Sequence, residues 1–199
     1  NGMWQEGVDK VLEVARCFFS NLYRSNGSLS SSLILDSIET CITPEMNLKL
    51  CAGFTVEEVK STFLQIHPNK APGFDGMPAS FFRSFWHIVG LDFIALCLDL
   101  LNGKADMHSV NITILVLIPK VDNPTLLKQF RPISLCSVVY KTCSKVLVNR
   151  LKSLMDGCIA MNQCAFVPGR LISDNFIVAH ELFHFLKGSK NSPNKGVAI

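Results

Sequence analysis

Apolar residues recur every three or four positions along much of the chain, which is the spacing of one face of an α-helix. The clearest case lies between Trp4 and Tyr23, where charged residues occupy the opposite face. We therefore predict an amphipathic helix over residues 4–23. The same periodicity predicts further helices over residues 55–66, 77–89, 91–101, 134–155 and 174–187.

Local signals mark the boundaries of the second predicted helix. Thr55 and Glu58 have the spacing of a capping box, in which each side chain satisfies a free backbone N–H of the first turn. Pro68 ends the helix, because proline disfavours helical geometry in the residue before it. The loop from Asn69 to Pro78 is rich in Pro, Gly and Asp but lacks the Gly-Lys-Ser/Thr ending of a phosphate-binding loop. We therefore interpret it as a structural turn.

One segment has the pattern of a complete β-strand. Residues 111–118 are rich in β-branched side chains, and Pro119 closes the segment. Because both faces of this strand are apolar, we expect it to be buried between other elements. A second strand is expected to begin at residues 196–199. Together these patterns predict an α+β fold in which helices dominate.

Aromatic and cysteine side chains are expected mainly in the core. Phe81, Phe82, Phe85 and Trp86 occupy apolar positions of a predicted helix, which favours core packing over a surface for stacking bases. No two of the eight cysteines have C-x-x-C spacing, and most lie in apolar runs. This distribution favours buried, reduced thiols over zinc ligands or disulfides.

The composition is that of a globular protein that functions inside the cell. Hydrophobic residues make up 48% of the chain and charged residues 18%, with a mean hydropathy of +0.29. We find no secretory leader and no apolar run of the roughly 20 residues that span a membrane. We therefore expect a nuclear or cytoplasmic location and no membrane association. Because the chain begins without methionine and ends inside a predicted strand, we also expect it to be part of a longer protein.

Positive charge is concentrated in one part of the sequence. Between Lys120 and Arg170 there are eight basic and two acidic residues, whereas the net charge of the whole chain is +3. Such a local excess favours an anionic partner, with nucleic acid the first candidate. The alternative is a solvated basic surface without a partner.

A zinc protease is a competing interpretation, because residues 180–184 read His-Glu-Leu-Phe-His. On a helix, His180 and His184 lie one turn apart and could bind zinc beside Glu181. No Asp, Glu, His or Cys follows His184 to supply a third ligand, and the surrounding apolar residues are explained by packing. No Gly-x-Ser-x-Gly motif indicates a serine nucleophile either. We therefore reject the metalloprotease interpretation.

A colinear series of short motifs resembles the reverse transcriptase of non-LTR (LINE-type) retrotransposons, of the kind abundant in plant genomes. The resemblance covers residues 54–199, and residues 1–53 are expected to form a helical lead-in segment. The motifs are Asn69-Lys70-Ala71-Pro72-Gly73, Leu117-Ile118-Pro119-Lys120, Phe130-Arg131-Pro132-Ile133-Ser134, Tyr140-Lys141, Asn149-Arg150, Asn162-Gln163 and Ala165-Phe166-Val167-Pro168-Gly169-Arg170.

The resemblance implies a fold and a set of substrates. The chain is expected to be the N-terminal, fingers portion of a right-hand polymerase fold, truncated before the catalytic strands of the palm. The family is an RNA-directed DNA polymerase, a nucleotidyltransferase that copies RNA into DNA at a nicked chromosomal target. The expected partners are an RNA template, a DNA primer or target, a deoxynucleoside triphosphate and the rest of the polymerase (palm, thumb and endonuclease).

The resemblance also implies roles for particular residues. Lys120 and Arg131 are expected to bind the phosphates of the incoming nucleotide, and the planar fork of arginine suits this role. Gln163, Phe166, Gly169 and Arg170 are expected to line the path of the template. The alternative for Arg131 and for Gly169-Arg170 is a structural role in anchoring turns.

The family's catalytic centre is not expected within these residues. The full-length enzymes use Mg²⁺ held by aspartates, and the positions of those aspartates lie beyond Ile199. The 199-residue chain is therefore expected to contain no catalytic residue and to bind no metal. The alternative function is a non-catalytic remnant, a helical domain that binds nucleic acid or protein.

We accordingly predict that the isolated 199-residue chain has no polymerase activity, because phosphoryl transfer needs carboxylates to hold its metal ions. Primer extension on an RNA template with magnesium measures this directly. DNA synthesis by the isolated chain would contradict the prediction.

Overall fold

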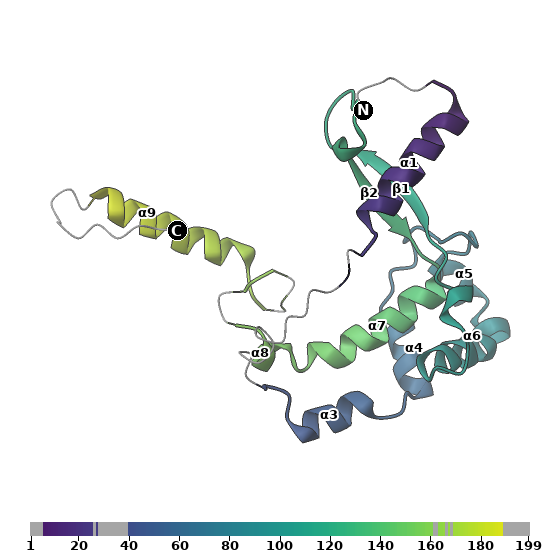
Figure 1. Cartoon of the computed structure of the whole chain (residues 1–199). Helices are drawn as coiled ribbons and strands as arrows, with labels where there is room; N and C mark the ends of the chain where they lie inside the picture. Colours follow the sequence, from purple (N-terminus) through teal and green to yellow (C-terminus); the bar gives the residue numbers. More distant parts are fainter. Residues whose placement is uncertain are drawn as a thin grey trace. The chain divides into compact units, whose positions relative to one another are not determined.

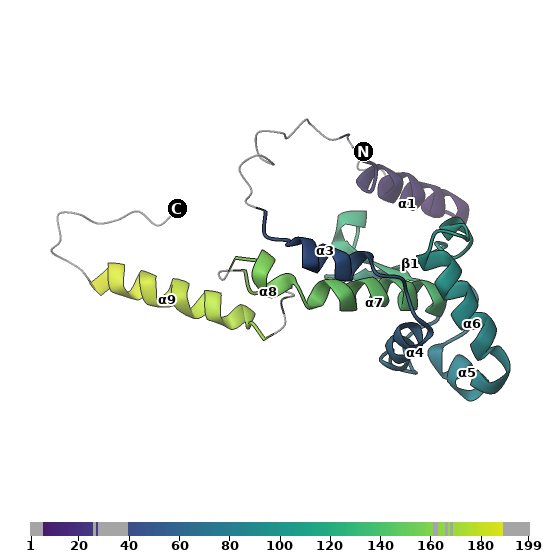
Figure 2. The same cartoon turned by 90° about the horizontal axis from the view of Figure 1, so that it is seen from below.

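The computed structural model describes residues 6–25, 27, 40–160, 163–165, 167 and 169–188. The described residues form two compact units. The first unit combines those of 1–39 with 54–143, and the second combines 40–53 with those of 144–199. Figures 1 and 2 show the elements of both units. The boundary expected at residue 53 from the resemblance stays a prediction.

The core of the first unit is built from three consecutive helices and the beginning of a fourth. Phe63 is 1% exposed and contacts the ring of Phe93 at 5.1 Å, and Phe82 contacts Phe93 at the same distance. The helices α4 and α5 each pack on α6 (Figure 2). The four helices are α4 (Val56–Leu64), α5 (Ala79–Ser84), α6 (Trp86–Leu101) and α7 (Val138–Lys152).

The prediction of an aromatic core is confirmed for Phe82 but wrong for two of its neighbours. Phe81 and Phe85 are 36% and 44% exposed. Their rings contact each other at 5.1 Å, and the ring of Phe81 also contacts that of Phe82 at 5.4 Å.

The predicted helix start at Thr55 is confirmed. The Thr55 hydroxyl accepts a hydrogen bond from the backbone N–H of Glu58 at 3.1 Å. At the other end of α4, Arg83 Nη2 donates to the carbonyl oxygens of Leu64 at 2.7 Å and Ile66 at 2.8 Å. Because the last carbonyls of a helix have no partner within the helix, a cationic donor stabilises this end.

The loop over residues 69–78 is a structural turn, as predicted. Gly76 has a φ of 67°, a left-handed conformation that glycine adopts without steric cost. Gly73 lies directly against the backbone of Ser137, at the start of α7. Lys141 Nζ donates to the carbonyl oxygen of Ala71 at 2.6 Å. These contacts fix the loop on the first turn of α7.

A β-hairpin follows the helices of the first unit. The strands β1 (Ile114–Pro119) and β2 (Phe130–Leu135) are antiparallel, with Ile114 opposite Leu135 and Pro119 opposite Phe130. Short 3₁₀ turns over Met107–Ser109 and Leu127–Gln129 flank β1. The predicted strand is therefore present, although it begins later than expected.

The expected burial of this strand is wrong. The side chains of Ile114, Leu115, Val116 and Ile118 are 39–45% exposed. The described sheet has two strands, and helix α1 (Val8–Leu22) lines a groove with Leu115 and Leu117 on one of its faces. Helix α1 confirms the first predicted helix from Val8 onward, and Trp4 lies outside the described residues. Of the apolar side chains on α1, Phe19 is buried.

The second unit contains α3 (Pro44–Cys51), the end of α7, α8 (Met155–Cys158) and α9 (Ile172–Gly188). The guanidinium of Arg150 donates to the carbonyl oxygens of Leu50 at 3.0 Å and Gly53 at 3.0 Å, and also to that of Ala52. This fork attaches α7 to the C-terminal end of α3. The strand expected at residues 196–199 lies outside the described residues.

The cysteines are free, as expected, but only some are buried. Cys97, Cys143 and Cys164 are buried, whereas the four at positions 17, 41, 51 and 158 are exposed. The Cys143 thiol hydrogen-bonds with that of Cys97 and, together with burial, raises the pKa of Cys97. The Cys97 thiol therefore stays protonated at neutral pH. Among the described helices, none is both long and apolar enough to cross a membrane.

We predict that Gly73→Ala lowers the free energy of unfolding by about 1–3 kcal/mol. A Cβ at this position would lie within 3 Å of the Ser137 backbone, which cannot move without shifting the start of α7. Urea unfolding of the purified chain measures the change. Gly53→Ala is the matched control, because a Cβ at Gly53 contacts nothing within 4 Å. Equal stability of both variants would contradict the prediction.

Candidate nucleic-acid interface

The hairpin brings Lys120 and Arg131 to the same face of the sheet. Arg131 lies directly opposite Ile118, and directly opposed residues share a face. Lys120 follows Ile118 by two residues and therefore shares that face, because side chains alternate along a strand. The Lys120 N–H donates to the Gln129 carbonyl at 2.8 Å, which continues the ladder beyond Pro119. The two cations are diagonal neighbours, a geometry in which the two residues are about 7–8 Å apart and their Cβ atoms somewhat closer.

Both cationic side chains are exposed, but they are held differently. Lys120 Nζ donates one hydrogen bond to the Lys128 carbonyl oxygen at 3.1 Å, which orients the ammonium across the hairpin and leaves two N–H groups available. Within the described part of the chain, no hydrogen bond or ion pair holds the Arg131 guanidinium. All of its donors can therefore be directed to a ligand.

The remainder of this face is apolar and uncovered. Ile118 is 43% exposed, and Val116 and Ile133 are 39% and 41% exposed. The alternate residues Leu115 and Leu117 belong to the opposite face, where they line a groove against α1. The two cations therefore stand at one end of an exposed apolar surface, which we call the outer hairpin face (Ile114, Val116, Ile118, Lys120, Arg131 and Ile133).

The second group of predicted site residues lies in the other unit, where Arg170 closes a loop. Its Nη1 donates to the carbonyl oxygens of Ala160 at 2.6 Å and Gln163 at 2.9 Å, and its Nη2 donates to that of Ile159 at 3.2 Å. Gly169 has a φ of 77°, and a Cβ there would contact nothing within 4 Å. Glycine is required here by the left-handed backbone of the turn and not by the close approach of a neighbouring atom.

These contacts give Arg170 the turn-anchoring role that was the alternative from the sequence. The Gln163 side chain remains exposed, and Phe166 lies outside the described residues. The structure thus pairs Lys120 with Arg131 in one unit and Gln163 with Arg170 in the other.

Sequence reasoning missed three cations that bind main-chain oxygens. Arg83 and Arg150 each donate to carbonyls next to the end of another helix, and Lys141 donates to Ala71 in the turn. Lys141 belongs to the basic stretch from Lys120 to Arg170, for which an anionic partner was expected. The sequence around Lys141 could not indicate this contact, because Ala71 lies 70 positions earlier in the chain.

The His-Glu-x-x-His motif lies on α9, as expected, but its surroundings differ from the prediction. The imidazoles of His180 and His184 are exposed, and the ring of Phe176 stacks on His180 at 6.4 Å. Apolar residues of α9 are also uncovered, with Phe176 at 73% and Phe183 at 61% exposed, so their predicted packing is wrong. The described residues contain no group of three or more His, Cys, Asp or Glu side chains that could hold a metal ion.

Comparison with known proteins relates the chain to a transposon. No protein-family model matches it. The chain is 29% identical over 184 residues to a protein of Xenopus laevis, described as the transposon TX1 uncharacterized 149 kDa protein. The aligned part covers 92% of this chain and 14% of that protein. The chain thus spans about one-seventh of the length of this relative and is similar to one region of a transposon protein.

We predict that Arg170→Lys speeds amide hydrogen exchange over residues 159–165 by roughly tenfold. Lysine keeps the charge but replaces two donor nitrogens with one, and a lost charge-assisted hydrogen bond costs about 1.5–3 kcal/mol. Hydrogen–deuterium exchange with mass spectrometry measures the rates. Arg131→Lys is the control and leaves them unchanged. Unaltered exchange in Arg170→Lys would show that the fork does not hold this loop.

Proposed function

We propose that the chain is the fingers portion of a non-LTR retrotransposon reverse transcriptase, and that its outer hairpin face binds the triphosphate of the incoming nucleotide. The observation that carries this proposal is the placement of Lys120 and Arg131 as exposed diagonal neighbours on one face of the hairpin. The colinear motifs and the likeness to a transposon protein support the class of protein.

The chemistry of the two cations suits a triphosphate. The Arg131 guanidinium is planar and can donate two parallel hydrogen bonds to one phosphate, and within the described residues nothing competes for them. The Lys120 ammonium acts as a compact point charge, oriented by the Lys128 carbonyl. The uncovered Val116 and Ile118 beside them offer an apolar surface to the base or sugar.

The loop closed by Arg170 is proposed to face the template. Because the Arg170 fork binds Ala160, Gln163 and Ile159, its contribution is to shape the loop. The exposed Gln163 side chain and the backbone around Gly169 are then the groups offered to the template strand.

The described residues do not fit a catalytic magnesium site. No cluster of carboxylates or other ligands is formed among them, and the resemblance assigns the metal-binding aspartates to positions after Ile199. We therefore derive no chemical step from this chain. Its proposed part in the reaction is to bind and orient the nucleotide and template for the remainder of the polymerase.

A non-catalytic remnant is the second candidate. The observation that favours it is the exposed apolar surface of α9, where Phe176, Val178 and Phe185 are 66–73% exposed. Such a surface is typical of a protein-binding element. The two candidates differ in what they require of the hairpin, since only the polymerase uses Lys120 and Arg131 to bind phosphate.

We predict that Lys120→Ala and Arg131→Ala each weaken binding of a deoxynucleoside triphosphate about tenfold, because each change removes one charge-assisted phosphate contact. The affinity of each variant should also depend less on salt concentration, because fewer cations meet the phosphates. Fluorescence anisotropy with a labelled deoxynucleoside triphosphate over a range of salt concentrations measures both quantities.

Lys104→Ala is the matched control, because Lys104 is also an exposed lysine of the first unit but belongs to neither hairpin strand. It should change neither the affinity nor its salt dependence beyond the effect of overall charge. Triphosphate binding that persists unchanged in the Lys120→Ala, Arg131→Ala double variant would overturn the proposal and favour the remnant.

A further inference from the structure

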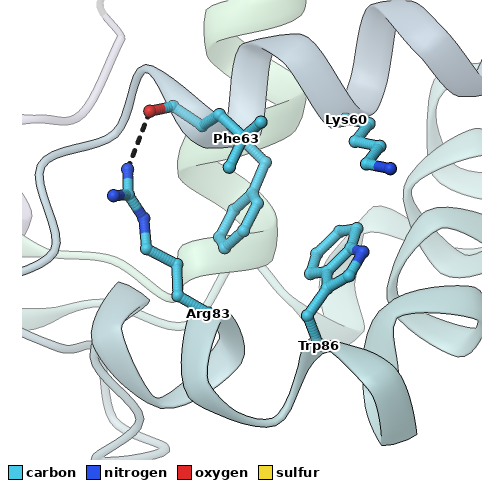
Figure 3. A pocket seen from close by; sticks show the side chains of 5 residues that line it. Lys60, Phe63, Arg83 and Trp86 are labelled. Atoms are coloured by element: carbon cyan, nitrogen blue, oxygen red, sulfur yellow. Dashed lines mark hydrogen bonds between the residues drawn. The ribbon is translucent and has the colours of Figure 1, made fainter.

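A pocket of about 310 Å³ lies between α4 and the pair α5–α6, away from the outer hairpin face. It is lined by Lys60, Phe63, Leu64, Arg83 and Trp86 (Figure 3). Its volume is at the lower end of the range for ligand sites, which suits one or two side chains rather than a large cofactor.

The aromatic rings at this pocket are already engaged in packing. The indole of Trp86 stacks on Phe63 with 4.9 Å between ring centroids and 11° between planes. The indole also lies over Gly90, where a Cβ would approach Trp86 Cε2 to 2.8 Å. Packing thus covers the indole face, and its N–H edge remains for a ligand. The pocket is therefore not a platform for stacking bases.

The polar groups of the pocket are all donors. Arg83 Nη2 is bound to the carbonyls of Leu64 and Ile66, but Arg83 Nε is a buried nitrogen without a partner. Over the described residues, neither Lys60 Nζ nor Trp86 Nε1 makes a hydrogen bond. A buried unpaired donor is costly, so Arg83 Nε calls for an acceptor. The exposed Lys60 ammonium and the half-buried Trp86 indole N–H are free to donate to a ligand.

The donors point to a ligand with two kinds of acceptor. Figure 3 shows the Lys60 amine and the indole nitrogen of Trp86 on one side of Phe63, and Arg83 on the other. A carboxylate can accept hydrogen bonds from Lys60 and Trp86, while a neighbouring peptide carbonyl can accept from Arg83. The exposed side chain of Leu64, at 55%, adds an apolar contact beside them.

We propose that this pocket binds an acidic side chain, flanked by apolar residues, from a peptide segment of a partner protein. Charge near the pocket favours a single carboxylate over a nucleic acid. Glu57 and Glu58 stand in the first turn of α4, just before Lys60. They repel any anion, and the repulsion grows with the charge of the ligand, so a single carboxylate is disfavoured less than an extended polyphosphate.

Nuclear magnetic resonance of the Trp86 indole tests this proposal. The chain has two tryptophans, so Trp4→Phe leaves Trp86 as the source of the single indole ¹H–¹⁵N signal. The probes are acetyl-Phe-Glu-Leu-amide and its neutral counterpart acetyl-Phe-Gln-Leu-amide. We expect the glutamate peptide to shift the signal saturably and to bind about fivefold more tightly than the glutamine peptide.

Lys60→Gln should reduce the affinity for the glutamate peptide to that for the glutamine peptide. Lys70→Gln, which removes an exposed lysine outside the pocket, is the control and should leave it unchanged. Neither variant alters a contact within the core, so the remaining amide signals should stay in place.

Three outcomes would overturn the proposal. The first is equal affinity for the two peptides or no shift with either. The second is a glutamate-peptide affinity that Lys60→Gln leaves unchanged. The third is a short oligouridine that shifts the indole signal at lower concentration than the glutamate peptide. None of them affects the nucleotide-binding proposal for the hairpin, because the two sites share no residue.

Discussion

The structure depends on the need to satisfy main-chain carbonyl oxygens at the ends of short elements. A helix leaves its last carbonyls without partners, and this chain has many short helices and turns. Arginine forks meet this need at three places, with Arg83 at the end of α4, Arg150 beyond α3 and Arg170 in the loop before α9. Each joins segments that are not neighbours in sequence.

This constraint changes how the positive charge of the sequence is interpreted. The stretch from Lys120 to Arg170 has a large excess of basic residues, which indicated an anionic partner. In the structure, Lys141, Arg150 and Arg170 donate to carbonyl oxygens, and Lys120 donates one of its hydrogen bonds in the same way. The number of basic residues therefore overstates the positive charge that is available to a ligand. Among the arginines of this stretch, Arg131 is the one whose guanidinium makes no hydrogen bond within the described residues.

Local features of the fold were predictable because they depend on neighbouring residues. The Thr55 cap, the turn over residues 69–78 and the presence of helices α4 to α7 follow from capping, glycine conformation and apolar periodicity. The predicted helix start at residue 134 is wrong, because residues 134–135 belong to β2 and α7 begins at Val138. One local element, α3, was missed although Thr43 caps it and Pro44 begins it. The other misses concern contacts between distant segments. Strand β2 was not predicted, because Pro132 interrupts its pattern, and proline is tolerated there because the sheet has no third strand among the described residues. Burial of β1 and of α9 also depended on partners that periodicity does not identify.

The hairpin register places Lys120 beside Arg131, and neither residue reveals this placement in the sequence on its own. From the sequence, Lys120 and Arg131 were two cations eleven positions apart, and the resemblance alone connected them. The register that sets Ile118 opposite Arg131 puts both on the outer hairpin face. A slip of one residue would turn Arg131 toward the α1 side and Pro132 outward, because side chains alternate along a strand. The turn between the strands, held by Gln129 Oε1 accepting from the N–H groups of Thr125 and Leu126, therefore determines whether the two cations can bind one ligand.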